Sequence, residues 1–196
     1  MTNILHITAS IKGATSVSRQ LSSKLVQQLA SGSDNVVERD LSVNDLPLLD
    51  ITRFTANGLP ANERSPAQAE LAAIADTLIA ELQAADTIVL GVPIYNFGAP
   101  STMKVWADLV ARAGTTFHYT ANGAEGLLAG KKAYITVASG GTKVDSETDF
   151  MTPWLRLFLG FIGIQDVEII AADQLMAGSS EAKIAEAEGL IGEVAA

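Results

Sequence analysis

The sequence predicts one α/β domain over residues 1–196, built on a doubly wound, five-stranded parallel sheet with helices on both faces. Three observations lead to this fold. Short apolar runs alternate along the chain with segments of helical periodicity, the runs are rich in β-branched residues, and no repeat, linker or low-complexity segment divides the sequence. Continuous apolar strands are typical of parallel sheets covered on both faces, and right-handed crossovers leave few other arrangements.

The first half of the chain is expected to hold three strands and two helices. The strands are Ile4 to Ala9, Asn35 to Leu41 and Thr87 to Val92. A helix that ends near Gly32 follows the first strand, because Leu21, Leu25 and Leu29 recur there on one face. A second helix begins at Ser65-Pro66, where a capping residue, a first-turn proline and the capping-box partner Gln68 come in order. Residues 42–64 are expected to form a long connection broken by proline and glycine.

The second half is expected to add two strands and three helices. The strands are Lys132 to Ala138 and Val167 to Ala172. One helix begins near Pro100 and stops by Gly114, another passes through Trp154 to Leu159, and the last is marked by Ile184, Ala187, Ile191 and Val194. Five strands therefore alternate with five helices.

Composition excludes several kinds of chemistry. The chain has no cysteine, so disulfides, thiolate catalysis and iron–sulfur clusters are excluded, and redox chemistry would require a borrowed cofactor. The net charge of -9, without a basic patch, opposes nucleic-acid binding. No apolar run reaches the ~18 residues of a membrane-spanning helix, and residues 1–10 lack the pattern of a signal peptide. We therefore expect a cytoplasmic protein without a nucleic-acid or membrane partner.

Three loops are the candidate ligand site, because ligands of such sheets bind at the carboxyl ends of the strands, where the strand order reverses. The loop after the first strand places four hydroxyl groups just before a helix, at Ser10, Thr15, Ser16 and Ser18. Free N–H groups and the helix dipole favour a phosphate there. Helix capping by Ser16 or Ser18 is an equally good interpretation of that pair taken alone.

The other two loops are ambiguous when each is taken alone. Pro93 to Phe97 places two aromatic rings around an amide at the end of a central strand, which suits either a flat aromatic cofactor or closure of the core. Gly140 and Gly141 allow either close approach to a ligand or a simple turn.

Other catalytic signatures are missing from the sequence. His6 lies in an apolar strand and is interpreted as a core residue, whereas the role of His118, between two aromatic residues, stays open. Neither belongs to a triad or a metal-binding motif. Gly130-Lys131-Lys132 is not a P-loop, because the earlier glycine is misplaced and no Ser or Thr follows Lys131.

Five segments of the chain form a recognisable set. They are Ser10, Ser16 to Ser18, Pro93 to Phe97, Leu109 to Phe117 and Phe158 to Gly163. Together they resemble the FMN-dependent NADH-azoreductase family, also described as NADH:quinone oxidoreductases. The resemblance extends from the first strand to the last helix, and the segment from Leu109 to Phe117 is the most specific.

The resemblance implies a flavodoxin-like fold, a bound FMN and an activity. The enzyme would take hydride from NADH and reduce quinones and aromatic azo compounds by two-electron ping-pong transfer. It would be a homodimer with FMN near the subunit interface. No side chain would be catalytic, because the flavin carries the chemistry, and no metal would be bound.

The resemblance also implies site residues by position. The phosphate would be held by Ser10, Ser16, Val17 and Ser18, the isoalloxazine would be lined by Ile94, Tyr95, Asn96 and Phe97, and a third contact would come from Ala138, Ser139, Gly140 and Gly141. The substrate would be surrounded by Phe117, Tyr119 and Phe161.

Two departures from the family pattern bear on the flavin and its substrates. Relatives often carry Ser-Arg-Gly-Gly where this chain has Ala138 to Gly141, and Lys143 stands where some relatives have a histidine.

Two other functions use the same fold. A flavodoxin-type carrier would bind FMN but pass single electrons between proteins, and a signalling receiver would need an acidic cluster where this chain has Ser10. Rapid bleaching of the flavin by NADH separates the enzyme from both.

Overall fold

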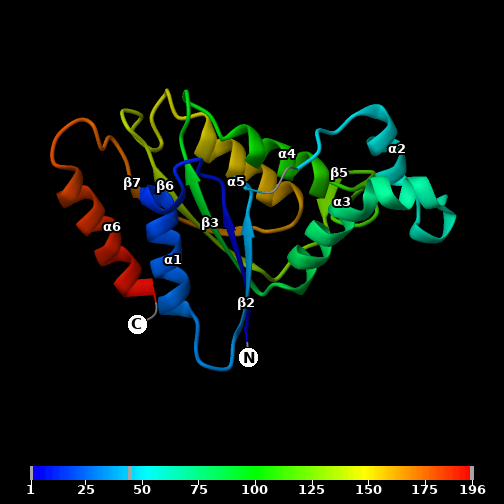
Figure 1. The fold of residues 1–196 in the computed structure, drawn as a ribbon, viewed down its shortest axis with the longest axis horizontal. Coiled ribbons are helices and arrows are strands. Elements are labelled where there is room, and N and C mark those ends of the chain that lie inside the picture. Colours follow the sequence, from blue (N-terminus) through cyan, green and yellow to red (C-terminus); the bar gives the residue numbers. More distant parts are fainter. Residues whose placement is uncertain (1, 44–45, 195–196) are drawn as a thin grey trace.

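The computed structural model describes residues 2–43 and 46–194. Residues 44–45 of the expected long connection and residues 1 and 195–196 of the expected domain lie outside the described residues. The strands of the main sheet are all parallel and lie in the order β2-β1-β3-β6-β7 (Figure 1). Their bounds are β1 Asn3–Thr8, β2 Asn35–Asp40, β3 Thr87–Pro93, β6 Lys132–Ala138 and β7 Asp166–Ala172. The predicted five-stranded parallel sheet is confirmed.

Helices cover both faces of this sheet, as predicted (Figure 1). One face is covered by α1 (Val17–Leu29) and α6 (Ser180–Val194), and the other by α3 (Pro66–Ala84), α4 (Ser101–Val110) and α5 (Met151–Phe161). The central strand β3 supplies Val89 to the apolar core under α1 and α6, and Leu90 to the apolar core on the opposite face of the sheet. Because successive side chains of a strand point to opposite faces, two covered faces account for its uninterrupted apolar sequence.

The described residues contain more elements than the five strands and five helices expected. The expected connection includes a sixth α-helix, α2 (Ile51–Gly58), followed by the 3-10 turn η2 (Ala61–Glu63). After α4 the chain forms an antiparallel hairpin of β4 (Phe117–Thr120) and β5 (Gly123–Gly126). The helix α2 is short and starts from an Asp50 cap, whose side chain accepts a hydrogen bond from Arg53 N (2.7 Å). The expected alternation of five strands with five helices therefore left out one helix and one hairpin.

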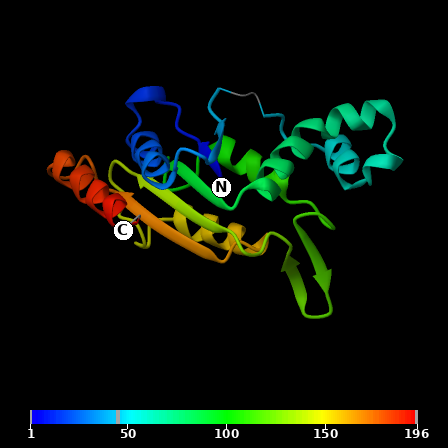
Figure 2. The same cartoon turned by 90° about the horizontal axis from the view of Figure 1, so that it is seen from below.

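The hairpin is held against the end of α5 by direct contact between backbones. A Cβ placed on Gly126 would lie only 2.0 Å from Gly163 N. Leu128 N, just past the hairpin, donates a hydrogen bond to Ile162 O (2.9 Å). Figure 2 shows the hairpin, in green, projecting beyond the rest of the molecule. Its attachment therefore depends on the small size of Gly126.

Two predictions about single residues are confirmed. Ser65 and Gln68 form the expected capping box of α3. His6 is a core residue: it is 2% exposed, its Nε2 lies 2.7 Å from Ser22 Oγ, and its Nδ1 lies 2.7 Å from Glu38 Oε2. No helix in the described part of the chain combines the length and apolar character needed to cross a membrane.

Candidate functional site

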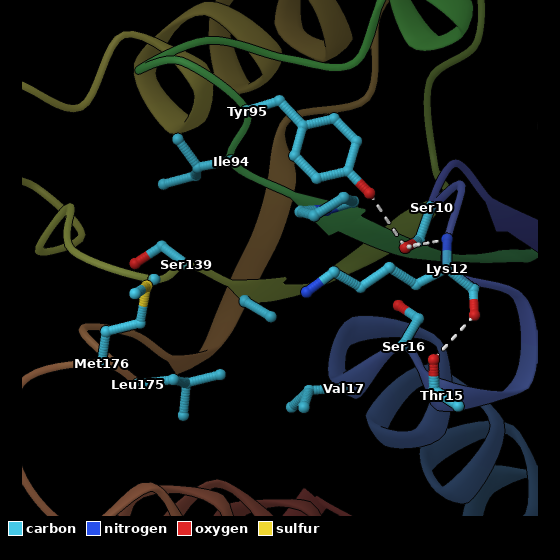
Figure 3. A pocket seen from close by; sticks show the side chains of 13 residues that line it. Ser10, Lys12, Thr15, Ser16, Val17, Ile94, Tyr95, Ser139, Leu175 and Met176 are labelled. Atoms are coloured by element: carbon cyan, nitrogen blue, oxygen red, sulfur yellow. Dashed lines mark hydrogen bonds between the residues drawn. The ribbon is translucent and has the colours of Figure 1, made fainter.

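A pocket of about 370 Å³ lies at the carboxyl ends of β1, β3 and β6, where the strand order reverses (Figure 3). Eight of the residues that line it were predicted from the sequence: Ser10, Ser16, Val17, Ile94, Tyr95, Ala138, Ser139 and Gly140. The remaining lining residues are Lys12, Thr15, Pro93, Leu175 and Met176. The three candidate loops therefore meet at one place.

A second hollow of about 270 Å³ adjoins the pocket, because Ile94 and Gly140 line both. It is lined by Ile94, Asn96, Phe97, Gly140, Gly141, Thr142 and Thr148. Three further predicted residues, Asn96, Phe97 and Gly141, are thus placed beside the pocket. Together the two hollows form one site, in which the serine hydroxyl groups line the pocket and the Phe97 ring lines the second hollow.

The hydroxyl end of the site is the start of α1. Ser16 Oγ caps the helix by accepting a hydrogen bond from Arg19 N (3.3 Å). The N–H groups of Val17 and Ser18 have no partner inside the helix, as expected for a first turn, and donate to no other group in the described chain. Capping and anion binding are therefore compatible, because the cap occupies one serine and leaves these N–H groups free.

The side chain of Ser18 lies behind the residues that line the pocket. Its side chain is fully buried and does not line the pocket, although its Oγ lies 3.2 Å from Ser16 Oγ. Its carbonyl accepts a hydrogen bond from Thr136 Oγ1 (2.8 Å) of β6. A Cβ on Gly91 would lie 3.0 Å from the same carbonyl, so α1 approaches β3 closely. Ser18 thus holds the start of α1 on the sheet.

Ser10 joins the first two loops of the site. Its Oγ lies 3.2 Å from Tyr95 Oη, and this phenolic oxygen also accepts a hydrogen bond from Ile11 N (3.3 Å). Ser10 Oγ further accepts a hydrogen bond from Lys12 N (3.3 Å). Figure 3 shows this network along one wall of the pocket. The loop after β1 is therefore fixed to the loop after β3.

The loop after β3 is a strained two-residue turn. Tyr95 and Gly98 exchange backbone hydrogen bonds of 2.9 and 3.0 Å, while Asn96 and Phe97 have φ angles of 49° and 70°. Positive φ is rare for a bulky residue such as Phe97, and such strain concentrates at functional sites. The turn is held from outside, because Phe150 N donates to Phe97 O (3.0 Å).

A buried carboxylate stabilises the segment that holds this turn. Burial raises the pKa of Asp149, but hydrogen bonds from the Thr152 hydroxyl and from the backbone of Thr152, Asp145 and Met151 outweigh it, so the pKa lies below its ordinary value of 3.8. Asp149 N–H itself donates to Ser146 O (3.0 Å). These hydrogen bonds fix Asp149, and they thereby position Phe150 for its hydrogen bond to Phe97.

Ser139 connects the loop after β6 to the loop after β7. Its Oγ accepts a hydrogen bond from Gln174 N (3.0 Å) and donates one to Thr142 O. The backbones of the two loops also pair, with Leu175 N on Ser139 O (3.0 Å) and Met176 N on Gly140 O (2.8 Å). Leu175 and Met176 thereby reach the pocket. The sequence interpretation missed this loop, although β7 ends at the same edge of the sheet.

The three predicted substrate residues lie together but apart from the pocket of their own chain. The rings of Phe117 and Phe161 are 4.4 Å apart, and those of Phe117 and Tyr119 are 5.5 Å apart. Phe117 is buried, whereas Tyr119 is 75% exposed on the hairpin. None of the three lines either hollow. His118, on the same hairpin, lies 3.3 Å from Glu125 Oε2 and is also absent from the pocket lining.

The donor set fits a flat ring that carries one phosphate. The hydroxyl end combines serine side chains with free helix N–H groups, and none of the described Asp or Glu side chains lines the pocket. The other end offers apolar walls, the Tyr95 and Phe97 rings, and glycine backbone. Within the described residues, no group of three or more His, Asp or Glu side chains is placed to hold a metal ion.

Comparison with known proteins points to one family. Residues 2–193 match the family model described as flavodoxin-like fold. The chain is 64% identical over 197 residues to an FMN-dependent NADH:quinone oxidoreductase of Erythrobacter litoralis, with 100% of both chains covered. It is 50% identical to FMN-dependent NADH:quinone oxidoreductase 1 of Jannaschia sp., with 90% of each covered.

Solved structures agree with these relatives. An azoreductase from Bacillus anthracis str. Sterne superposes with a TM-score of 0.90 at 25% identity, covering 100% of this chain and 99% of that one. An FMN-dependent NADH-azoreductase from Bacillus anthracis str. Ames Ancestor, in complex with FMN, gives a TM-score of 0.88 at 25% identity, covering 100% and 98%. The chain therefore belongs to the flavodoxin-like fold family and, within it, to the FMN-dependent NADH:quinone oxidoreductases.

Proposed function

We propose that this protein is an FMN-dependent oxidoreductase that takes hydride from NADH and reduces quinones and aromatic azo compounds. The observation that carries this function is 64% identity over the whole chain to an FMN-dependent NADH:quinone oxidoreductase. The pocket supports it, because a phosphate site and a ring site adjoin there. Reduction of the bound flavin by NADH without oxygen tests the proposal.

The residues divide into those that hold the phosphate and those that hold the ring. Ser10, Ser16 and the N–H groups of Val17 and Ser18 would bind the phosphate. The ring would lie against Ile94, Tyr95, Asn96 and Phe97, with backbone contacts from residues 138–141. When bound, FMN supplies the redox chemistry, while the protein supplies binding, orientation and electrostatics.

The enzyme is preferred to the two other functions of this fold. A one-electron carrier would also bind FMN, but the relatives with the highest identities reported above are named as NADH-consuming oxidoreductases. A signalling receiver would need acidic residues after β1, whereas Ser10 stands there and no acidic side chain in the described part of the chain lines the pocket.

Replacing Ser16 by alanine is expected to weaken FMN binding by about 1.5–3 kcal/mol, because its hydroxyl lines the pocket and would donate to a charged phosphate. Ser18→Ala is expected to have a smaller effect, since the Ser18 hydroxyl reaches the pocket only through Ser16. Flavin fluorescence during titration of flavin-free protein measures both dissociation constants.

Ser65→Ala is the matched control for the loss of a helix cap. Ser65 caps α3 as Ser16 caps α1, but it lies outside the pocket. Its loss should cost about 1 kcal/mol of folding stability and leave FMN affinity unchanged. If Ser16→Ala and wild type have the same FMN dissociation constant, Ser16 acts only as a helix cap and does not bind the phosphate.

We further propose a symmetric homodimer in which the aromatic cluster of one subunit borders the FMN site of the other. None of the three aromatic residues lines the pocket of its own subunit, and Tyr119 is 75% exposed. Two large apolar side chains are also exposed at α5, where Phe150 at the N-cap is 65% exposed and Leu157 within the helix is 74% exposed. We also propose that the protein acts in the cytoplasm without nucleic-acid or membrane partners, since its net charge of -9 opposes binding to polyanions.

Leu157→Glu is expected to shift the protein from dimer to monomer, because a twofold interface uses the same surface twice and the charge would enter both halves. Analytical ultracentrifugation measures the shift. Leu190→Glu is the control, since Leu190 is a 44% exposed leucine on α6, which packs on the opposite face of the sheet. A wild-type protein that sediments as a flavin-loaded, fully active monomer would contradict the dimer.

A further inference from the structure

Among the residues that the structure describes, Lys12 is the one charged residue that lines the pocket. Figure 3 shows its side chain extending into the pocket, toward the space between Ser16 and Ser139. Arg19 and Lys24, which follow on α1, pair with Asp40 (2.7 Å) and Glu188 (2.9 Å). Lys12 has no carboxylate partner in the described part of the chain. Lys12 is exposed to solvent, and its ammonium is therefore an unpaired, solvated positive charge at a pocket whose other described lining groups are neutral.

The backbone of Lys12 is fixed on both sides. Its N–H donates to Ser10 Oγ (3.3 Å), and Ser10 is itself held by Tyr95. Its carbonyl accepts hydrogen bonds from Thr15 N (3.3 Å) and Thr15 Oγ1 (2.9 Å). The starting point of the side chain therefore belongs to the same network as the phosphate site.

The start of α1 would neutralise only part of the charge of the FMN phosphate. A phosphate monoester carries a charge of about -1.5 to -2 near pH 7, and a helix N-terminus supplies only about half a positive charge. Serine hydroxyl groups add neutral hydrogen bonds. In a chain with a net charge of -9, a lysine ammonium beside the phosphate would offset part of the charge that remains.

We propose that Lys12 is the charge partner of the FMN phosphate and that it gives the site its preference for FMN over riboflavin. This inference rests on the proposed FMN-dependent function. A lysine suits the role because it is a compact charge on a flexible stem, which adjusts to a ligand without a rigid geometry. The pairing adds a charged interaction to the neutral contacts of Ser10, Ser16 and α1.

FMN and riboflavin form a matched pair of probes, because they differ only in the phosphate. Flavin-free wild-type protein and Lys12→Met are titrated with each flavin by fluorescence, at low and high salt. The variant is expected to bind FMN about ten- to a hundredfold more weakly and riboflavin with unchanged affinity. The salt dependence of FMN binding should also be smaller in the variant. Lys12→Arg should retain most of the affinity, and Lys24→Met, on the outer part of α1, should match wild type.

Two results would overturn the role of Lys12. One is equal FMN affinity of wild type and Lys12→Met. The other is equal weakening of FMN and riboflavin, because this would reflect a change in pocket shape rather than a lost charge pair. Failure of the wild-type protein to bind either flavin would instead contradict the FMN-dependent function and the role of Lys12 together.

Discussion

Gly126→Ala is expected to destabilise the protein by about 3 kcal/mol or more, which exceeds the usual cost of an added methyl group in a packed core. The new Cβ would lie 2.0 Å from Gly163 N and 2.3 Å from Ile162 C. These are backbone atoms, so no side-chain rotation relieves the clash. The end of β5 must therefore separate from the end of α5.

This separation is expected to disturb the aromatic cluster more than the FMN pocket. The hairpin carries Phe117 and Tyr119, whereas the pocket is built from other loops. Urea unfolding measures the stability, and Gly189→Ala is the control, since a Cβ at Gly189 on α6 meets nothing within 4 Å. The control should be stabilised by up to about 1 kcal/mol, because alanine favours helices. A Gly126→Ala protein within 1 kcal/mol of wild type would contradict the packing described.

Asp76→Asn is expected to cost about 3 kcal/mol of folding stability at neutral pH, because it leaves two enclosed guanidinium groups without a counter-charge. Asp76 on α3 lies 2.6 Å from Arg64 Nη1 and 2.5 Å from Arg112 Nη1. The arginine side chains are only 4% and 10% exposed. The carboxylate is 41% exposed, and water therefore screens part of the interaction. The expected loss of folding stability consequently lies at the low end of the range for a broken buried ion pair.

The same carboxylate predicts how stability changes with pH. Burial raises the pKa of Asp76, but hydrogen bonds and charge attraction from Arg112 and Arg64 outweigh it, and the pKa lies below its ordinary value of 3.8. A depressed folded-state pKa contributes stability that is present above the unfolded-state pKa and is lost as pH falls through the folded-state value. Asp76→Asn should therefore lose less stability than wild type on acidification below about pH 4.

Asp108→Asn is the matched control for both effects. Its partner Lys104 is one helical turn away on α4, and both side chains are largely solvated, with exposures of 38% and 56%. An exposed pair of this kind contributes about 0.5 kcal/mol or less. Equal stabilities of Asp76→Asn and Asp108→Asn in urea at pH 7 would contradict the structural role of Asp76.

The sheet, the helices that cover it and three loops of the site could be predicted from the sequence, because their signals are local. Apolar runs identify the strands, and a capping box identifies the start of α3 at Ser65. Parallel strands then bring their carboxyl ends to one edge, so Ser10, Tyr95 and Ser139 had to lie near each other. The positions of these residues thus followed from the fold class.

The missed elements depend on contacts that leave no local pattern. The hairpin has only four residues in each strand, and its attachment depends on Gly126 meeting the backbone at Gly163. The strained turn carries phenylalanine at position 97, where a typical tight turn would have glycine. The loop after β7 enters the pocket through backbone pairing with residues 139–140, which side-chain patterns do not encode.

The most direct measurement of the central claim is an anaerobic absorbance titration of the FMN-loaded protein with NADH. The account predicts rapid loss of the oxidised flavin spectrum with an equimolar amount of NADH, because one hydride carries the electron pair. It also predicts that a quinone added after the NADH is consumed restores the spectrum fully, because the reduced flavin passes its electron pair to the quinone without NADH present. A protein that binds FMN tightly but whose flavin NADH fails to bleach would contradict the account and indicate a one-electron carrier.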